Sequence, residues 1–281
     1  HSRNGGQLCH KPRADGKEGE GLMLRKILIL ALACVFLVSA GSFGIKYIDY
    51  KKGEELYEEA VQSFQTESQS SGFSVTEEEE DVNYSSLIPE ITMDFDALAE
   101  INTDIIGWIL VPGTNVNYPL LKGSDNDEYL RRAFNGVSSR MGSIFMDYRC
   151  ASDFNDRHTI IYGHNMRNST MFSRLLNYED YDFWKEHRYI DIKTKDGERK
   201  YEIIAAYRTE IQEKGSSAFR YYSFTDTDKA SEYDEYLQGI KKLALYDTGL
   251  SAEYGTQLMT LSTCSYHTDN GRFAVAAMRI E

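Results

Sequence analysis

An uncharged apolar run of 19 residues, residues 27–45, constrains this chain more than any other feature of its sequence. A helix needs about 20 apolar residues to cross the hydrocarbon core of a bilayer, so the run predicts a membrane span. Arg25 and Lys26 precede it, and the positive-inside rule then puts the N-terminus in the cytoplasm and most of the chain outside. The alternative is a cleaved signal peptide ending near residues 38–40. It is disfavoured because apolar runs of signal peptides are usually about 7 to 15 residues long.

The composition narrows the class of protein. The 281 residues carry 31 Lys+Arg against 44 Asp+Glu, a net charge of −13, which excludes a basic nucleic-acid binder. Hydrophobic residues at 41% are enough to build a core, which excludes global disorder. The 4 cysteines are far apart and fit neither a disulfide framework nor a zinc cluster. No motif requires a bound cofactor or a metal.

Four segments are predicted: an N-terminal cytoplasmic stretch, the span, a helix with an acidic linker, and a globular domain. Their bounds are residues 1–26, 27–45, 46–90 and 91–281. Residues 1–22 are polar and precede Met23, a natural start for an anchor peptide, so they could be non-native and are left out of the fold prediction. Apolar residues at helical spacing in residues 54–64 indicate an amphipathic helix. Because residues 54–100 hold 14 acidic residues and no Lys or Arg, the following linker is interpreted as a solvated stalk rather than a cation site.

The globular domain is predicted to be mainly β. Strand patterns occur at residues 106–111, 117–121, 142–146, 159–162, 189–194, 201–208, 257–263 and 273–280. Eight strands are enough to close a barrel, and a turn such as Lys195-Asp196-Gly197-Glu198 between two apolar runs favours antiparallel hairpins. Peripheral helices are expected at residues 95–102, 125–133, 170–186 and 228–244.

Reactive side chains stand at the ends of two of these strands. The apolar strand 257–263 leads directly to Cys264, and the strand 159–162 stops at a Gly163-His164 turn. Arg272 begins the strand after the cysteine, and antiparallel pairing across the loop would return its guanidinium to the same strand end. A thiol, an imidazole and a fixed cation would then converge.

The three groups suit acyl transfer. A thiolate can attack an acyl carbon, an imidazolium can protonate the leaving amine, and a guanidinium can hold the developing oxyanion. Each residue also has a simpler interpretation, because Cys264 could be a small buried hydrophobe, His164 could cap a turn, and Arg272 could pair with an acid. Spacing alone leaves both interpretations open.

The chain from about residue 95 to its end resembles the sortases, membrane-anchored cysteine transpeptidases of Gram-positive bacteria. The matching motifs are Thr260-Leu-Ser-Thr-Cys264, Gly163-His164 and Arg272. The segment 142–149, Tyr162-Gly-His-Asn165, a helical extension before the barrel and the long insertion between the histidine and the cysteine resemble class B.

That resemblance implies an eight-stranded sortase-type barrel with Cys264 as nucleophile, His164 as general acid and base, and Arg272 as oxyanion or substrate clamp. The implied substrates are secreted proteins with a C-terminal Asn-Pro-x-Thr-Asn/Gly-like sorting motif, cleaved after Thr through a thioester. The implied acceptor is an amine of the peptidoglycan peptide or its lipid-linked precursor. The implied location is the cell membrane, with a single span and the catalytic domain outside a Gram-positive-type cell. Substrate-binding positions that resemble those of class B are Asn126, Leu130, Tyr222 and Ser262.

Two other functions stay open at this stage: a cysteine endopeptidase that uses water as acceptor, and a non-catalytic membrane-tethered scaffold. Among the remaining residues, His267 after Cys264 is not interpreted as a zinc ligand, since no second ligand pair follows. Cys150 is expected to be a buried structural thiol, and His158 and His187 are expected at the surface.

Overall fold

The structure is a computed structural model that describes residues 15–67, 91–213, 215–225, 229–265, 268 and 270–281. The chain divides after Asp49 into two compact units, and each is described by itself. The helix α1 (Asp15–Phe64) supplies the described part of the first unit and the beginning of the second.

The first unit contains the predicted span. Within the described ranges, α1 is the one helix long and apolar enough to cross a membrane, and none of its apolar window is buried in the protein. Large apolar side chains such as Leu30 and Phe36 are exposed there. A helix that is apolar on all sides needs an apolar surrounding, so α1 is compatible with a membrane anchor.

The second unit begins with the last four turns of α1, which pack on the barrel. Tyr57 and Ala60 are buried, and Leu56, Val61 and Phe64 pack against the same core, which confirms the amphipathic helix predicted at residues 54–64. The Tyr57 hydroxyl donates a 2.7 Å hydrogen bond to the Gly142 carbonyl. A short antiparallel pair of β1 (Gln65–Glu67) and β2 (Ile91–Met93) follows. The acidic run at residues 77–81 lies outside the described residues.

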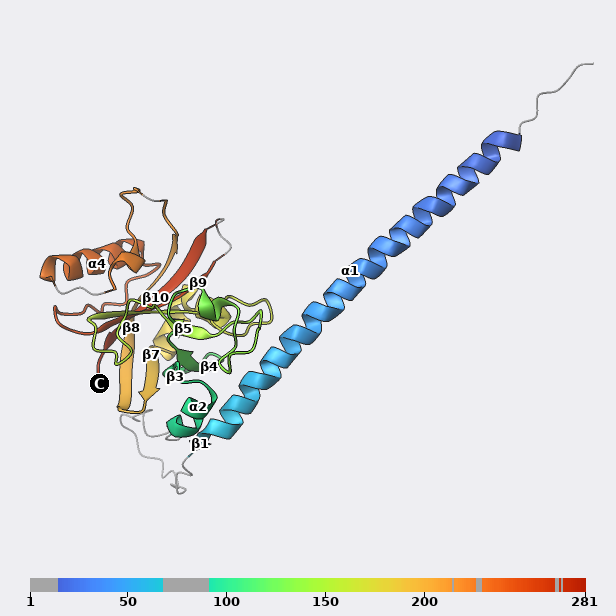
Figure 1. Cartoon of the computed structure of the whole chain (residues 1–281). Coiled ribbons are helices and arrows are strands. Elements are labelled where there is room, and N and C mark those ends of the chain that lie inside the picture. Colours follow the sequence, from blue (N-terminus) through green and yellow to red (C-terminus); the bar gives the residue numbers. More distant parts are fainter. Residues whose placement is uncertain (1–14, 68–90, 214, 226–228, 266–267, 269) are drawn as a thin grey trace, which may run out of the picture. The chain divides into compact units, whose positions relative to one another are not determined.

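Eight strands close into a barrel in the order β10-β8-β7-β3-β4-β5-β6-β9 (Figure 1). Their bounds are β3 (Ile105–Val111), β4 (Val116–Leu121), β5 (Ile144–Met146), β6 (His158–Tyr162), β7 (Tyr189–Thr194), β8 (Gly197–Glu210), β9 (Leu258–Cys264) and β10 (Gly271–Arg279). The pairs β4–β5 and β6–β9 are parallel and the other pairs antiparallel. The predicted eight-stranded, mostly antiparallel barrel is therefore confirmed, as is the hairpin between residues 194 and 197.

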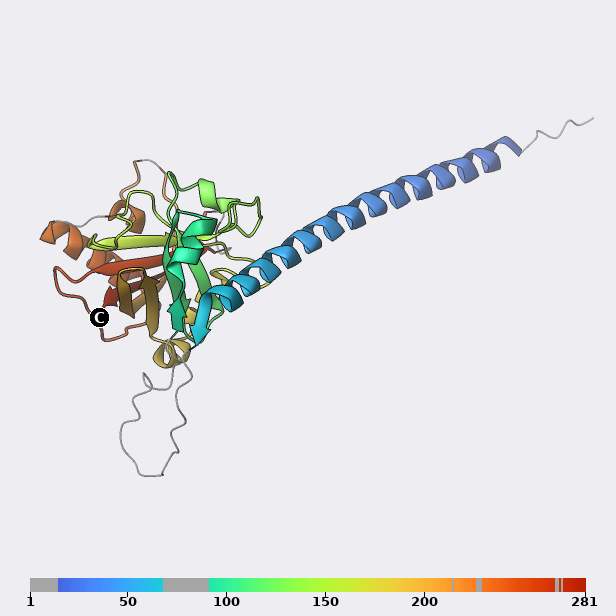
Figure 2. The same ribbon diagram turned by 60° about the horizontal axis from the view of Figure 1, so that its bottom comes forward.

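Strand β10 shows why the last strands are almost continuously apolar. Phe273 and Val275 point into the main barrel core, whereas Ala274 and Ala276 face a second core beneath α4 (Ala230–Leu243). The helix contributes its buried face to that second core and packs on the outside of β8 (Figure 2). Strands buried on both faces lose the alternating pattern of half-exposed strands.

The predicted helices are only partly confirmed. The helix α2 (Phe95–Ile101) begins at Asp94, whose carboxylate accepts from the Ala97 amide at 2.9 Å, and α4 occupies most of residues 228–244. The helix expected at residues 125–133 is wrong, because only the 3-10 turn η2 (Glu128–Leu130) forms there. The Asp125 carboxylate accepts from the amides of residues 127 and 128, at 2.9 Å each, and this local turn competes with a longer helix.

The helix expected at residues 170–186 is divided in two. A 3-10 helix, η3 (Ser173–Glu179), is followed by α3 (Tyr181–Glu186), and Asp180 between them is extended. The Asp180 carboxylate accepts from the Asp182 amide at 2.9 Å and so starts α3 as a cap.

The surface position expected for His158 is wrong, because the residue is fully buried between β9 and α4, whereas His187 is partly exposed. Its Nδ1 contacts the Phe224 carbonyl, which can only accept, so Nδ1 carries the proton. Its Nε2 then accepts from the Thr260 hydroxyl at 2.8 Å, and that hydroxyl is 2.6 Å from the Tyr236 hydroxyl. Burial lowers the pKa of His158 to about 4 and favours this neutral ring.

We expect His158 to make stability depend on pH between about 6.5 and 4. In that window the unfolded chain binds a proton that the folded protein does not, so the free energy of unfolding falls as the pH is lowered, by up to about 1.4 kcal/mol per pH unit. Above pH 6.5 the neutral ring is favoured in both states and the effect vanishes. The variant His158→Gln should lack this part of the slope.

Urea unfolding at pH 7, 6 and 5, followed by tryptophan fluorescence, measures the difference. His187→Gln is the matched control and should keep the slope of the unmodified protein. Equal slopes for His158→Gln and the unmodified chain would contradict the assignment.

Candidate active site

Cys264 is the last residue of β9, at the edge of the barrel. Residues 258–263 of this strand are all buried, and Cys264 is the first that reaches solvent in part. Strand β10 pairs antiparallel with β9, and Arg272 is the direct partner of Cys264 in the register. The Ser265 amide donates to the Gly271 carbonyl at 2.9 Å and closes the connection between the strands. The predicted return of Arg272 to the strand end is therefore observed.

His164 lies on the other side of Cys264. Strand β6 pairs parallel with β9 up to Tyr162 and Ser262, and the Gly163 amide continues the ladder by donating to the Ser262 carbonyl at 3.2 Å. A Cβ at Gly163 would lie 2.5 Å from the side chain of Ile144 and 2.7 Å from that of Phe172, so any other residue would force these side chains to move. The turn therefore delivers the imidazole next to the end of β9.

The imidazole is held in one orientation. Its Nε2 is 2.8 Å from the Leu130 carbonyl, and because a carbonyl only accepts, Nε2 donates. In the neutral ring, Nδ1 is then the nitrogen with the free lone pair. The next residue, Asn165, donates from Nδ2 to the Cys264 carbonyl at 2.9 Å and ties the histidine turn to the cysteine strand.

All seven residues predicted from the sequence line a single pocket of about 340 Å³. They are Asn126, Leu130, His164, Tyr222, Ser262, Cys264 and Arg272. The guanidinium of Arg272 donates from Nη1 to the Gly271 carbonyl at 2.9 Å, which fixes it beside the pocket. The pocket thus combines a thiol, an imidazole and a guanidinium.

The four predicted substrate-binding residues occupy different parts of the wall. Leu130 ends η2, and Tyr222 belongs to the short 3-10 helix η4 (Tyr221–Ser223). The Ser262 hydroxyl is buried and lies 2.7 Å from the hydroxyl of Tyr221. The Asn126 side chain donates to the Asp147 carboxylate and accepts from the Tyr148 amide, both at 3.0 Å. The Tyr222 hydroxyl accepts from the Gln212 amide at 3.0 Å, so three of the four side chains are held by internal hydrogen bonds.

Several residues of the pocket were not singled out from the sequence as site residues. Phe145, Arg149 and Ile211 are among them, and Tyr221, next to the predicted Tyr222, lines the pocket as well. Burial raises the pKa of Tyr221 to about 12, although the hydrogen bond to Ser262 and the nearby Arg272 cation act in the opposite direction. Arg149 stands in the segment 142–149 that matches class B, but nothing in its spacing marks it as a pocket residue.

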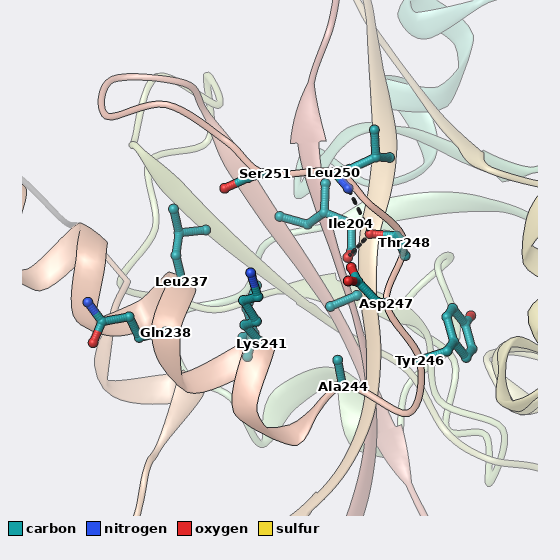
Figure 3. A pocket seen from close by; sticks show the side chains of 12 residues that line it. Ile204, Leu237, Gln238, Lys241, Ala244, Tyr246, Asp247, Thr248, Leu250 and Ser251 are labelled. Atoms are coloured by element: carbon teal, nitrogen blue, oxygen red, sulfur yellow. Dashed lines mark hydrogen bonds between the residues drawn. The ribbon is translucent and has the colours of Figure 1, made fainter.

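A second pocket, of about 410 Å³, lies between α4 and the segment 244–251 against β8 (Figure 3). The Thr248 hydroxyl donates to the Ile204 carbonyl at 2.8 Å and holds the segment on the strand. Its lining includes Lys241 and Asp247 but neither cysteine nor histidine. The nucleophilic chemistry therefore belongs to the pocket at the end of β9.

Cys150 differs from Cys264 in its surroundings. It is buried, its sulfur faces the His158 carbonyl at 3.8 Å, and burial raises its pKa to about 12, as expected for a structural thiol. His267 lies outside the described residues. Within the ranges that the structure covers, no group of three or more His, Cys, Asp or Glu side chains is placed to hold a metal ion.

Comparisons with known proteins agree on one family. The family model described as "Sortase domain" matches residues 109–280. The sortase B of Staphylococcus aureus is 31% identical over 265 residues, which cover 92% of this chain and 98% of that protein. The solved structure of sortase B from Bacillus anthracis in complex with AAEK1 superposes with a TM-score of 0.66 at 31% identity, covering 84% of this chain and 99% of the other. The Staphylococcus aureus sortase B–substrate complex gives a TM-score of 0.59 at 33% identity and covers 66% and 84%.

We expect the two barrel thiols to react very differently with iodoacetamide in the folded protein. Cys264 reaches solvent and lines the pocket, whereas a buried thiol with a pKa of about 12 forms almost no thiolate near pH 8. Peptide-resolved mass spectrometry should show alkylation of Cys264 at least about 100 times faster than that of Cys150. Unfolding in urea should bring the two rates together. Comparable rates in the folded state would contradict the placement of the two sulfurs.

Proposed function

The chain belongs to the sortases, and among them to class B, and on this premise we propose that it cleaves a C-terminal sorting motif and transfers the protein to a cell-wall amine. The family identity makes it a cysteine transpeptidase. The finer proposal is a motif of the Asn-Pro-x-Thr-Asn/Gly kind, cut after the threonine through a thioester on Cys264.

The first half-reaction is acylation. Nδ1 of His164 takes the thiol proton of Cys264, the thiolate attacks the threonine carbonyl carbon, and the oxyanion that forms is stabilised by the guanidinium of Arg272. Collapse breaks the peptide bond, and His164 gives a proton to the departing amine. Since its Nε2 donates to Leu130, Nδ1 is the atom that exchanges protons in this scheme. The product is a thioester between the threonine and Cys264.

The second half-reaction is transfer. A neutral acceptor amine attacks the thioester carbonyl, His164 takes the proton that the amine loses, and the tetrahedral intermediate expels the Cys264 thiolate. Arg272 stabilises the same oxygen in both steps. It cannot act as a base because a guanidinium does not deprotonate in proteins. The acceptor is proposed to be an amine of the peptidoglycan peptide or of its lipid-linked precursor.

The observation that carries the proposal is the register at the end of β9. Cys264 is directly paired with Arg272, His164 follows the strand on the other side, and all three line one pocket. Asn126, Leu130, Tyr222 and Ser262 are proposed to contact the sorting peptide from the walls. The solved Staphylococcus aureus sortase B–substrate complex, of a similar protein, supports the binding of a substrate by this fold.

Membrane anchoring is proposed on the apolar part of α1. Residues 27–45 would form a single span, with residues 1–26 in the cytoplasm and the catalytic domain at residues 91–281 on the extracellular side of a Gram-positive-type cell. Residues 46–90 would connect the two. This location would place the pocket where secreted substrates and cell-wall amines meet.

The proposal is tested with a sorting-motif peptide and triglycine as the amine. The unmodified protein should form a covalent adduct on Cys264, visible by intact mass spectrometry, and should yield the ligated peptide. Cys264→Ala should abolish the adduct and the ligation, because it removes the nucleophile, while far-UV circular dichroism stays unchanged.

Cys150→Ala is the matched control and should keep the adduct. An adduct that persists in Cys264→Ala would overturn the assignment of the nucleophile. Hydrolysis without ligation at high triglycine concentration would instead favour a cysteine endopeptidase, and no reaction in any variant would favour a membrane-tethered scaffold.

A further inference from the structure

A buried carboxylate lies directly beneath the pocket. Asp147 follows β5, is fully buried and does not line the pocket itself. Its Oδ1 accepts from the amide and from Nε of Arg149, at 3.0 and 2.8 Å. Its Oδ2 accepts from Nη2 of Arg149, from Nδ2 of Asn126 and from the Tyr162 hydroxyl, at 2.8, 3.0 and 2.9 Å. Five donors therefore saturate one carboxylate.

This group is ionised in the folded protein. Burial alone would raise its pKa, but the hydrogen bonds from Arg149, Asn126 and Tyr162 together bring the pKa of Asp147 below its usual value. The Arg149 guanidinium meets the carboxylate through two parallel contacts, the geometry that orients both groups most strictly.

The three residues that donate side-chain hydrogen bonds to Asp147 all line the pocket. Asn126 lies in the loop before η2, Tyr162 ends β6, and Arg149 follows β5. Nη2 of Arg149 donates in addition to the Tyr222 carbonyl at 2.9 Å, which brings in η4. One carboxylate thus connects segments that are far apart in the sequence and form different parts of the wall.

Resting on the proposed function, we infer that Asp147 is a positioning residue that sets the spacing of the pocket walls for the sorting peptide. Through Arg149 it fixes the Tyr222 segment, and directly it fixes Asn126 and Tyr162. The peptide itself touches the walls and never Asp147. The effect is on peptide binding rather than on the chemistry of the thiol.

A separation of binding from chemistry follows from the contacts of Asp147. Within the described part of the chain, its hydrogen bonds reach none of Cys264, His164 and Arg272. The β9 register positions these residues, and the Leu130 carbonyl that orients His164 is not a partner of Asp147 either. Replacing a whole buried ion pair with apolar side chains is often neutral or stabilising, so a requirement for stability does not by itself account for a carboxylate at this position. What the carboxylate provides is a fixed geometry of the wall.

Asp147→Asn tests this with the smallest change of shape. The amide replaces one acceptor oxygen with an NH₂ donor. If the NH₂ takes the place of Oδ1, the hydrogen bonds from the amide and from Nε of Arg149 are lost. If it takes the place of Oδ2, the donors of Arg149, Asn126 and Tyr162 lose their acceptor. Either orientation leaves at least two donors without their acceptor, so the wall loosens while the volume is kept.

With the sorting peptide, we expect kcat/KM of Asp147→Asn to fall by about 10- to 100-fold, mainly through a higher KM, with kcat within about threefold. The rate of Cys264 alkylation by iodoacetamide should stay within about twofold, which a collapsed site would not allow. Asp96→Asn is the matched control: this exposed carboxylate pairs with Lys195 at 2.6 Å far from the pocket lining, and its kinetics should equal those of the unmodified protein.

Amide hydrogen exchange provides a readout without turnover. In Asp147→Asn, the amides of residues 124–127 and 218–225 should exchange faster, whereas β9 and β10 should be unchanged. If the unmodified protein turns over no sorting peptide, the proposed function fails, and the exchange still decides the role of Asp147.

An unchanged KM, a fall in kcat alone, a parallel loss of Cys264 alkylation or unchanged exchange in both wall segments would each overturn the inference. Should Asp147→Asn fail to fold, Arg149→Lys replaces the two-point contact with a single ammonium and should raise KM in the same direction. An unchanged KM in that variant would overturn the inference as well.

Discussion

The hydrogen-bonded register of β9 with its two neighbours is the constraint on which the site depends. On one side β10 runs antiparallel and places Arg272 opposite Cys264. On the other side β6 runs parallel to β9, and the hydrogen bond from the Gly163 amide to the Ser262 carbonyl extends that pairing to the residue before His164. The three reactive side chains therefore owe their proximity to backbone ladders. A slip of one residue in either ladder would turn Cys264 to the other face of the sheet.

The ladders in turn depend on packing from both sides. The main barrel core and the core beneath α4 each bury residues of β8, β9 and β10, so these strands have little freedom to shift. Close backbone approaches complete the support, since a Cβ at Gly142 would lie 2.6 Å from the Tyr129 carbonyl and 3.1 Å from His164. The Tyr57 hydroxyl of α1 donates a hydrogen bond to the carbonyl of this same Gly142. The end of the N-terminal helix therefore helps to fix the backbone that packs against His164.

The strands and the reactive residues could be predicted from the sequence because each is marked by a pattern of residues close together in the chain. Strand periodicity, turn residues and the strand-end positions of Cys264 and His164 can be recognised within short windows, and the family motifs added the roles. The predictions that were wrong or missing concern residues whose environment is formed by segments far away in the sequence. The burial of His158 requires Thr260 and Phe224, and the importance of Asp147 appears only when Arg149, Asn126 and Tyr162 surround it. The helix predicted at residues 125–133 was wrong for a local reason. The Asp125 side chain accepts hydrogen bonds from the backbone and forms a turn instead.

The central claim is that one carbonyl of the substrate meets Cys264, His164 and Arg272 together. A crystal structure of the protein with a sorting-peptide analogue trapped through a disulfide on Cys264 tests it most directly. We expect the threonine carbonyl oxygen to lie about 3 Å from a guanidinium nitrogen of Arg272, with the peptide passing between Leu130 and Tyr222. A peptide bound to Cys264 whose carbonyl receives no hydrogen bond from Arg272, or which leaves the pocket on another side, would contradict the account.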